Sequence, residues 1–350
     1  MLLVIRGAQR ASLQVGAASV AVMLAIAVAA PAAAHDLSEQ AAEQAAIEAS
    51  RQVAFAPALR PGDRVSDHGI TLVVPEAGHG VWGELKFDDG TYQTLQIATT
   101  RAGVVQLLEW GDEVAAAHDD LLAASPGLIG LDPTVGAKAM VDPDAQHRDG
   151  RAECRDRDHN LFAWRTTRYQ WRYSTATTPR KFRQRGGGEQ AIIDAIIRAN
   201  QNIVRATNVC GRSDMVSASF SYLGTTTRRT DVGTNGSCGR GDGQSVIGWG
   251  RLPTRSIAFT CVRWSGGKRS SEADIKLNWY KRYETTRSAC SGDEFLIEAV
   301  MTHEMGHVYG LAHVSALWNQ SLTMQPVIQY CSRSSASLGL GDMLGLERKY

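Results

Sequence analysis

The chain has 350 residues, of which 43% are hydrophobic and 21% are charged, an ordinary globular composition with room for about two domains. This composition excludes a largely disordered chain, a collagen-like fibre and a protein with many membrane spans. The formal net charge of +1 hides an acidic region and a basic region. Residues 35–150 have a net charge of −12 and residues 151–350 one of +11, so the simplest partner of each region is the other, and we expect no nucleic-acid partner.

Residues 1–34 have the pattern of a secretory signal peptide. Arg6 and Arg10 precede the uncharged run Val15–Ala30, and Ala32–Ala34 supplies the small residues of a cleavage site. The alternative is an uncleaved membrane anchor, but the run is short for a span, which needs about 20 apolar residues. We therefore expect secretion after cleavage near Ala34 and no stable membrane association.

Residues 35–150 are predicted to form an acidic, β-rich region that precedes the main domain. Asp36–Gln52 has the composition of a short amphipathic helix. Runs typical of strands follow, separated by turn residues: Ile70–Val74, Gly80–Phe87, Tyr92–Thr99 and Gly103–Trp110. The opposite charge of residues 151–350 leads us to expect a pro-region that docks there. The alternative is an accessory domain that stays attached and binds substrate.

Leu131–Gly150 is rich in Pro, Gly and Asp and is predicted to be a linker. Arg148, Arg151 and Arg155 lie at its end and are candidate cleavage sites for a trypsin-like protease. We expect removal of the pro-region there after secretion. A separate 35–150 fragment should inhibit the 151–350 domain, and less well as ionic strength rises.

All six cysteines lie in the third predicted segment, residues 151–350; they are Cys154, Cys210, Cys238, Cys261, Cys290 and Cys331. An even number in one region indicates up to three disulfides formed in an oxidising compartment. Fifteen pairings are open. The alternatives are reduced core cysteines or a cysteine zinc site, and the absence of any Cys-x-x-Cys pair disfavours the latter.

Residues 151–350 mix predicted strands with predicted helices. Trp164–Tyr173 is predicted to be an edge strand, and Glu189–Thr207 a helix because Ile192, Ile196 and Ile203 recur at helical spacing. Further strands are expected at Ser245–Trp249, Ser256–Trp264 and Ala273–Trp279.

A second helix carries a pattern of histidines. Ser291 is its candidate N-cap, and Glu294 completes a capping box. His303 and His307 are four residues apart, so both imidazoles lie on one face of the helix and can reach one zinc ion. Glu304 follows the first of these ligands, where its carboxylate can approach the open, solvent position of the metal.

A third histidine follows the helix. Gly310 can take the left-handed conformation that turns the chain sharply, which would bring His313 back to the same metal. Three neutral nitrogen ligands leave a fourth position for water, the arrangement of a catalytic rather than a structural zinc.

The stretch His303–His313 has the H-E-x-x-H-x-x-G-x-x-H pattern and resembles the metzincin zinc proteases. Its five fixed positions have a chance match on the order of 10⁻⁵ per chain. Metzincins also have a methionine turn, which Met324 matches, and Pro326 two residues later resembles the Met-x-Pro turn of the matrixin branch. Glu272–Ile275 resembles the strand before the active-site loop, and Gly341–Tyr350 the closing helix. The resemblance covers about residues 154–350.

The resemblance implies an α+β catalytic domain with a twisted mixed sheet, two long helices and a zinc cleft, preceded by the small β-rich pro-region. One catalytic Zn²⁺ would be held by His303, His307 and His313, with Glu304 as general base. Met324 would lie under the metal. Substrate would lie along an edge strand, and Pro326 and Val327 would wall the pocket beyond the scissile bond.

Two features depart from the family. Matrixin pro-regions block the zinc with a cysteine thiolate, whereas residues 35–150 contain no cysteine, so a blocking group there must be a carboxylate or a histidine. The second, structural zinc of vertebrate matrixins is not expected, because His159 is the one histidine between Cys154 and Met301. The sequence does not decide whether Ca²⁺ binds.

These features predict a secreted, monomeric zinc endopeptidase that acts on protein or peptide substrates. Two alternatives remain open: a zinc amidase that acts on cell-wall peptides, and a non-catalytic secreted module that contains zinc. Cleavage of unstructured proteins argues against the first, and bound zinc without hydrolysis favours the second.

Overall fold

The structure is a computed structural model, and it describes residues 3–5, 52–55, 59–67, 69–109, 152–184, 187–266, 268–314, 321–332 and 334–350. Three predictions lie outside these residues. They are the signal peptide apart from Leu3–Ile5, the helix over Asp36–Gln52 apart from its last residue, and the linker over Leu131–Gly150 with the adjoining Arg151.

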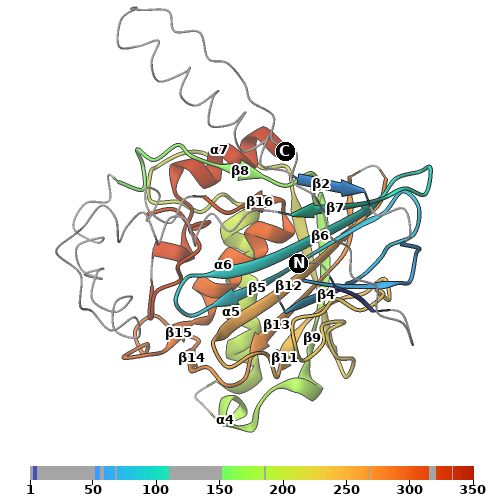
Figure 1. Cartoon of the computed structure of the whole chain (residues 1–350). Helices are drawn as coiled ribbons and strands as arrows, with labels where there is room; N and C mark the ends of the chain where they lie inside the picture. Colours follow the sequence, from blue (N-terminus) through green and yellow to red (C-terminus); the bar gives the residue numbers. More distant parts are fainter. Residues whose placement is uncertain are drawn as a thin grey trace, which may run out of the picture.

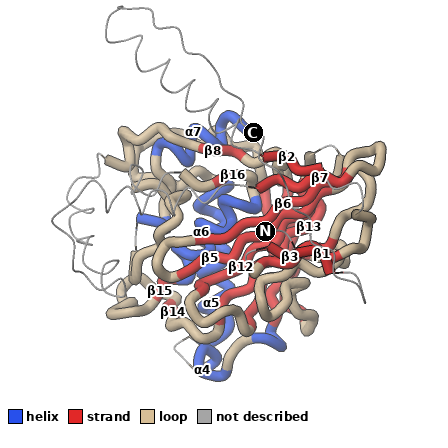
Figure 2. The backbone as a smooth tube through the Cα atoms, in the orientation of Figure 1, coloured by secondary structure: helices blue, strands red, loops and turns tan. Residues whose placement is uncertain are grey.

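A mixed sheet dominates the part of the chain that the structure describes, where nine strands follow the order β10-β9-β11-β13-β12-β5-β6-β7-β2 (Figures 1 and 2). The strands β10, β9, β11 and β13 are parallel, and every pair from β13–β12 onward is antiparallel. Their bounds are β2 Gln52–Phe55, β5 Gly80–Phe87, β6 Tyr92–Thr99, β7 Val105–Glu109, β9 Arg168–Ser174, β10 Ser219–Thr226, β11 Ser245–Gly250, β12 Ser256–Trp264 and β13 Ser270–Asn278. The sheet therefore continues from residues 151–350 into residues 35–150 at the β12–β5 pair.

Two helices pack against one face of this sheet: α5 (Gly188–Val204) and α6 (Ile297–Val308), which contact each other (Figure 1). Ile196 of α5 and Met301 of α6 share a hydrophobic core with Ile275 of β13. Shorter elements complete the fold: β1 Leu3–Ile5, β3 Arg64–Asp67, β4 Ile70–Val73, β8 Asn160–Leu161, η1 Thr175–Thr177, α4 Arg180–Arg183, β14 Tyr283–Glu284, β15 Phe295–Leu296, β16 Leu311–Ala312, η2 Ser334–Ala336 and α7 Leu340–Lys349. Among the described residues, no helix combines the length and apolar character that crossing a bilayer requires.

A second hydrophobic core joins residues 59–109 to residues of the third segment. Leu72 of β4 and Leu85 of β5 lie in it together with Phe259 of β12. Because side chains alternate along a strand, Val81 and Leu85 enter this core while Trp82 points the other way, into the core shared with the helices. The strand β5 is therefore buried on both faces.

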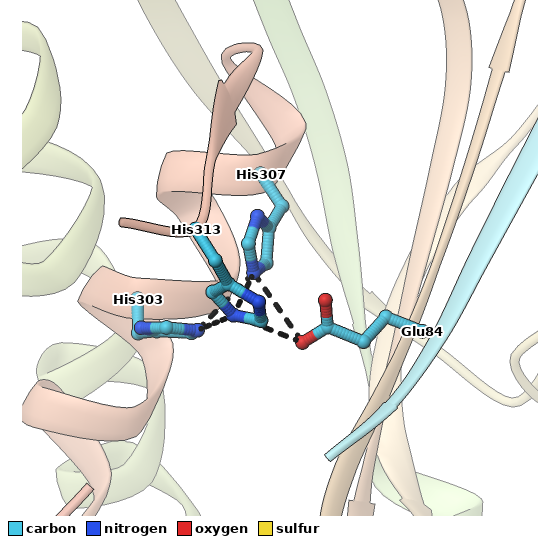
Figure 3. Close-up of side chains that lie close together, drawn as sticks. All are labelled: Glu84, His303, His307 and His313. Carbon is cyan, nitrogen blue, oxygen red and sulfur yellow. Dashed lines mark hydrogen bonds and ion pairs between the residues drawn. The ribbon is translucent and has the colours of Figure 1, made fainter. Parts of the chain in front are cut away.

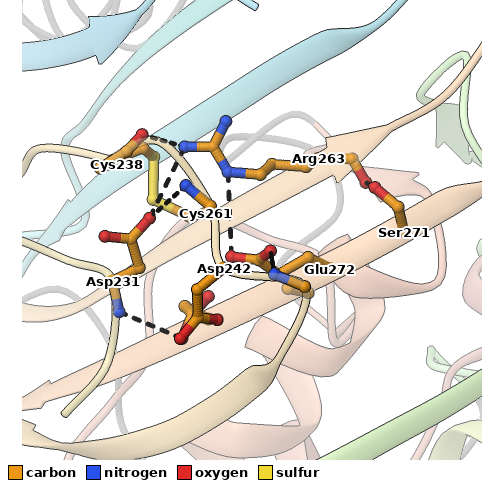
Figure 4. Close-up of polar contacts among 12 residues, drawn as sticks. Asp231, Cys238, Asp242, Cys261, Arg263, Ser271 and Glu272 are labelled. Atoms are coloured by element: carbon orange, nitrogen blue, oxygen red, sulfur yellow. Dashed lines mark hydrogen bonds and ion pairs between the residues drawn. A yellow bond between two sulfur atoms is a disulfide. The ribbon is translucent and has the colours of Figure 1, made fainter. Parts of the chain in front are cut away.

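The six cysteines form three disulfides, Cys154–Cys210, Cys238–Cys261 and Cys290–Cys331, which selects one of the fifteen pairings that the sequence left open. The Cys238–Cys261 bridge ties the loop before β11 to β12. Figure 4 shows the polar contacts beside it, where the Arg263 guanidinium donates to the Gly239 carbonyl and lies 3.8 Å from Asp231. The disulfide and these contacts fix the loop on the sheet.

Most elements agree with the sequence patterns, and the strands expected at Gly80–Phe87, Tyr92–Thr99 and Ser256–Trp264 have those bounds. The prediction of an edge strand over Trp164–Tyr173 was wrong. The strand β9 is internal, between β11 and β10, because Ser219–Thr226 adds a strand on its outer side. The sequence analysis expected no strand over those residues.

The predicted start of the histidine helix was also wrong. The helix α6 begins at Ile297 rather than after Ser291, because Phe295 and Leu296 are extended and pair with Tyr283 and Glu284. One bond of the expected capping box is present, from the Ser291 N–H to the Glu294 carboxylate at 3.3 Å. This bond closes a turn that precedes α6, whereas a capping box would close the first turn of the helix.

Candidate metal centre

The helix α6 carries His303 and His307 one turn apart, and both side chains are fully buried. Gly306 lets another element approach this helix closely, because a Cβ there would lie 2.2 Å from the Met324 sulfur. Met324 is itself buried and packs on α6 at this point. The glycine before His307 thus makes room for the predicted methionine turn.

His313 reaches the same place through a turn at Gly310, whose φ of +91° is the left-handed conformation expected from the sequence. A Cβ at this glycine would lie 2.4 Å from the Trp164 carbonyl oxygen, so a larger residue would also clash. After the turn, β16 pairs with β8, and the Asn160 side-chain amide donates to the His313 carbonyl at 2.8 Å. These contacts hold the third histidine beside the first two.

The three imidazoles converge through their Nε2 atoms (Figure 3). The Nε2 atom of His303 lies 3.0 Å from that of His313 and 3.1 Å from that of His307, and the third distance is 3.2 Å. Nitrogen ligands bound tetrahedrally to one zinc at about 2.0–2.1 Å lie about 3.3–3.4 Å apart. The Nε2 separations in the cluster are within about 0.4 Å of those expected for a zinc site.

Backbone carbonyls orient two of the rings. The Nδ1 atom of His303 lies 2.8 Å from the Thr323 carbonyl oxygen, and that of His307 lies 2.9 Å from the Leu311 carbonyl oxygen. A carbonyl can only accept, so each Nδ1 carries the proton and each Nε2 presents its lone pair to the centre of the cluster. This is the tautomer that a metal requires.

A fourth side chain, Glu84 of β5, completes the cluster. Its Oε1 atom lies 3.4 Å from the Nε2 atoms of both His307 and His313, and Figure 3 shows the carboxylate directed at the three rings. Glu84 is buried, and neither of its oxygens has a hydrogen-bond partner among the described residues. A buried carboxylate without hydrogen bonds is costly unless positive charge lies near it. Lys86 supplies one such charge, and a divalent cation among the histidines would supply a second.

The acidic residue of the motif, Glu304, is buried beside this cluster. Its Oε2 atom accepts a hydrogen bond from the Thr260 hydroxyl of β12, and its Oε1 atom has no hydrogen-bond partner in the described part of the chain. Burial, followed by the charge of Glu84, raises the pKa of the Glu304 carboxyl. A raised pKa suits a group that must take up a proton and release it again.

Lys86, two residues after Glu84, points to the same side of β5. Its Nζ atom lies 3.1 Å from His303 Nε2 and donates to the Pro326 carbonyl. Burial lowers the pKa of Lys86 to about 8, against the opposing effect of Glu84 and Glu304.

Burial and the nearby cation of Lys86 lower the pKa values of His303 and His313. At His307 burial also acts to lower the pKa, but Glu84 outweighs it and raises the pKa.

The methionine turn is held by a residue that the sequence reasoning did not single out, Asp342 of α7. One of its oxygens accepts the Thr323 N–H at 2.8 Å and the Gly339 N–H at 2.9 Å, and the other accepts the Met324 N–H at 3.1 Å. Since the Thr323 carbonyl orients His303, Asp342 supports a candidate metal ligand indirectly. Burial raises the pKa of Asp342 to about 6 despite these three bonds.

The predicted pocket residues lie under the hairpin between β5 and β6. The Pro326 carbonyl accepts from Lys86, and a Cβ at Gly90 would lie 2.4 Å from Val327. Tyr92 of β6 covers His313, with ring centroids 4.1 Å apart.

Sequence reasoning missed Glu84, Lys86 and Thr260. For Glu84 and Lys86, the available signal was the strand pattern of Gly80–Phe87, where these two charged residues alternate with apolar ones within a hydrophobic run.

Residues 264–350 match the family model of the matrixins. The matched segment runs from the end of β12 to the end of α7; it contains the three histidines, Glu304 and Met324 but not Glu84. No curated protein matches the chain. The match and the histidine cluster together support a matrixin-like zinc metalloprotease.

Proposed function

We propose that the protein is a secreted, zinc-dependent endopeptidase that hydrolyses peptide bonds in proteins or peptides. The observation that carries this proposal is the convergence of three Nε2 lone pairs within 3.2 Å of one another, beside the buried carboxylate of Glu304. The matrixin match over the same residues supports the reaction class. The three disulfides are consistent with an oxidising, extracellular compartment.

His303, His307 and His313 would hold the zinc. When bound there, the ion lowers the pKa of a water ligand towards neutrality and polarises a carbonyl group as a Lewis acid. Glu304 takes a proton from the attacking water at Oε1, the oxygen that Thr260 leaves free, and gives the proton to the leaving amine. The Thr260 hydroxyl holds the carboxylate in place during both transfers.

Residues 35–150 serve in this proposal as a pro-region docked on the catalytic domain, removed near Arg148–Arg155 after secretion. The signal peptide is cleaved near Ala34, and the mature enzyme is a monomer. The acidic region and the basic region attract each other, and their covalent link gives a high effective concentration.

One observation favours a second function. With Glu84 the cluster offers four protein ligands, and a closed four-ligand shell is typical of structural zinc. A non-catalytic secreted module would need no open position. The two functions differ in whether any hydrolysis appears once residues 35–150 are removed.

The test measures casein cleavage by the chain after limited trypsin treatment, trypsin inhibition and purification. We expect cleavage that a zinc chelator abolishes and added zinc restores. Glu304→Gln, treated in the same way, should retain one zinc per chain while turnover falls by about 10²–10⁴-fold, because the general base is lost and the ligands remain. Zinc-loaded, processed protein that cleaves neither casein nor short peptides would instead support the non-catalytic module. Near wild-type turnover by Glu304→Gln would refute the role of Glu304.

A further inference from the structure

The strand β5 occupies the edge of β12 that would otherwise be the last strand of the sheet in residues 151–350. It pairs with β12 antiparallel from Gly80 to Phe87, through backbone hydrogen bonds. An open edge of this kind is where an extended peptide adds to a sheet. In this chain, an internal segment takes that place.

The register of this pairing puts Glu84 directly opposite Thr260, whose hydroxyl binds Glu304. A substrate paired along the same edge would present its peptide group at this level, between the metal ligands and the general base. The carboxylate of Glu84 lies there instead, 3.4 Å from two of the ligand nitrogens. Those distances equal the spacing of zinc ligands derived above, so Glu84 has the position of a fourth ligand.

The neighbouring residues close the site on both sides. Trp82 packs on the ring of His307, with centroids 5.1 Å apart, and the β5–β6 hairpin covers Val327 through Gly90 and His313 through Tyr92. These are contacts with a metal ligand or with the predicted pocket wall. A peptide could not enter while they persist.

We infer that β5 is an internal occupant of the substrate position, in which Glu84 is the fourth ligand of the zinc and replaces the catalytic water. This inference rests on the proposed function, because it assigns the inhibited form of the same site. The blocking group is a carboxylate from the region that contains no cysteine.

Cutting the chain between residues 109 and 152 does not by itself free the site. The backbone pairing of β5 with β12 and the second hydrophobic core, which contains Leu72, Leu85 and Phe259, are noncovalent and remain after the cut. Activation therefore requires a second event, either dissociation of the cut segment or its further digestion. The cut protein should show a lag before activity appears.

The first experiment tests Glu84 as a ligand in the uncut, full-length chain. Zinc affinity is measured by competition with a chromophoric chelator, and the cobalt(II) form is titrated with azide while its visible spectrum is recorded. Glu84→Ala should weaken zinc binding by at least about tenfold, since even partners outside the ligand shell change metal affinity by 10–100-fold. It should also open a position at which azide shifts the cobalt spectrum, whereas the wild-type spectrum should not respond.

Glu76→Ala is the matched control, because Glu76 is an exposed carboxylate just before the same strand. It should behave as wild type, and circular dichroism should show that both variants are folded. Unchanged zinc affinity together with an unchanged cobalt spectrum in Glu84→Ala would overturn the assignment of Glu84. A wild-type spectrum that responds to azide would overturn it as well.

The second experiment distinguishes the effect of Glu84 as a ligand from the effect of β5 as a cover over β12. Uncut Glu84→Ala should remain nearly inactive on peptides, because β5 still covers β12, while wild-type protein cut between 109 and 152 should gain activity with the lag described above. High peptidase activity of uncut Glu84→Ala would show that the strand does not occupy the substrate position. If Glu84 tests as a ligand but no processed protein hydrolyses peptides, the proposed function fails while the ligand assignment stands.

Discussion

Residues 264–350 and residues 59–109 contribute to one cluster of candidate metal ligands in different ways. The first segment supplies three histidines through local chain geometry, a helix turn and a glycine turn, and it matches the matrixin family model. The second supplies Glu84 through long-range pairing of β5 with β12, and it lies outside that match. The first arrangement is visible as a spacing of residues, whereas the second depends on the register between strands far apart in the chain.

This difference indicates a division of roles. Ligands fixed by local geometry persist whenever their helix and turn are folded, so they suit the permanent part of the site. A ligand that arrives on a docked strand can leave with that strand. The predictions below test this division, from the largest expected effect to the smallest.

Loss of a histidine should have the largest effect. His303→Ala, His307→Ala or His313→Ala should each reduce zinc affinity by more than about a hundredfold, because a direct ligand and its local support are both lost. Protein purified with each change should contain almost no zinc by elemental analysis, whereas the exposed His79→Ala should retain one zinc per chain. The zinc affinity of Glu84→Ala should lie between that of the histidine variants and that of His79→Ala. Full zinc content in His313→Ala would mean that the third ligand is misassigned.

Changing the glycine turn should have the next largest effect. Gly310→Ala combines a left-handed φ of +91° with a clash against the Trp164 carbonyl, and we expect a loss of about 3 kcal/mol or more in the free energy of unfolding and weaker zinc binding. Gly243→Ala is the control for φ alone, since that glycine has φ +75° and open space around its Cβ position. Its cost should be about 1–2 kcal/mol with zinc affinity unchanged. Denaturant unfolding measures the free energy of unfolding of each variant, and zinc titration measures its zinc affinity. Equal costs would mean that the Trp164 contact is unimportant.

The sequence predicted what local patterns determine. The strand β5 and the convergence of the three histidines follow from alternation, helical spacing and glycine conformation. It could not identify Glu84 itself, because a one-residue shift in register would have turned Glu84 away from the three histidines. The helix start at Ser291 was wrong for a similar reason: pairing of Phe295 with Tyr283 overrode a local capping pattern.

Asp342 lies within the matched segment but is marked by no pattern, and it should give a moderate, pH-dependent effect. Its folded pKa of about 6 exceeds its ordinary value of 3.8, so the folded state binds the proton more tightly and stability should fall as pH rises from about 4 to 6. The contribution is at most about 3 kcal/mol. Asp342→Asn should remove that part of the pH dependence. At neutral pH two effects of Asp342→Asn should oppose each other, because the amide cannot accept all three backbone N–H bonds but also carries no buried charge.

Urea unfolding of the metal-free wild type and Asp342→Asn between pH 4 and 7 measures this difference and keeps zinc release out of the comparison. Identical slopes of stability against pH for the two proteins would contradict a raised pKa at Asp342.

Salt should have the smallest effect on how the two regions hold together. Their net charges of −12 and +11 suggest docking driven by charge, but the β5–β6 hairpin makes two ion pairs with residues 151–350 at partly exposed positions, Lys281–Asp88 and Arg255–Asp89, within the part of the chain that the structure describes. Such pairs contribute about 0.2–1 kcal/mol each, whereas strand pairing and the shared core are insensitive to salt. After cleavage between 109 and 152, raising NaCl from about 0.05 to 0.5 M should therefore slow reassociation clearly but weaken the complex by no more than about thirtyfold. Replacing Asp88 and Asp89 by Asn should remove most of this dependence of the complex's affinity on salt. A weakening of several hundredfold would show that charge, rather than β5 and the core beneath it, holds the inhibiting segment on the site.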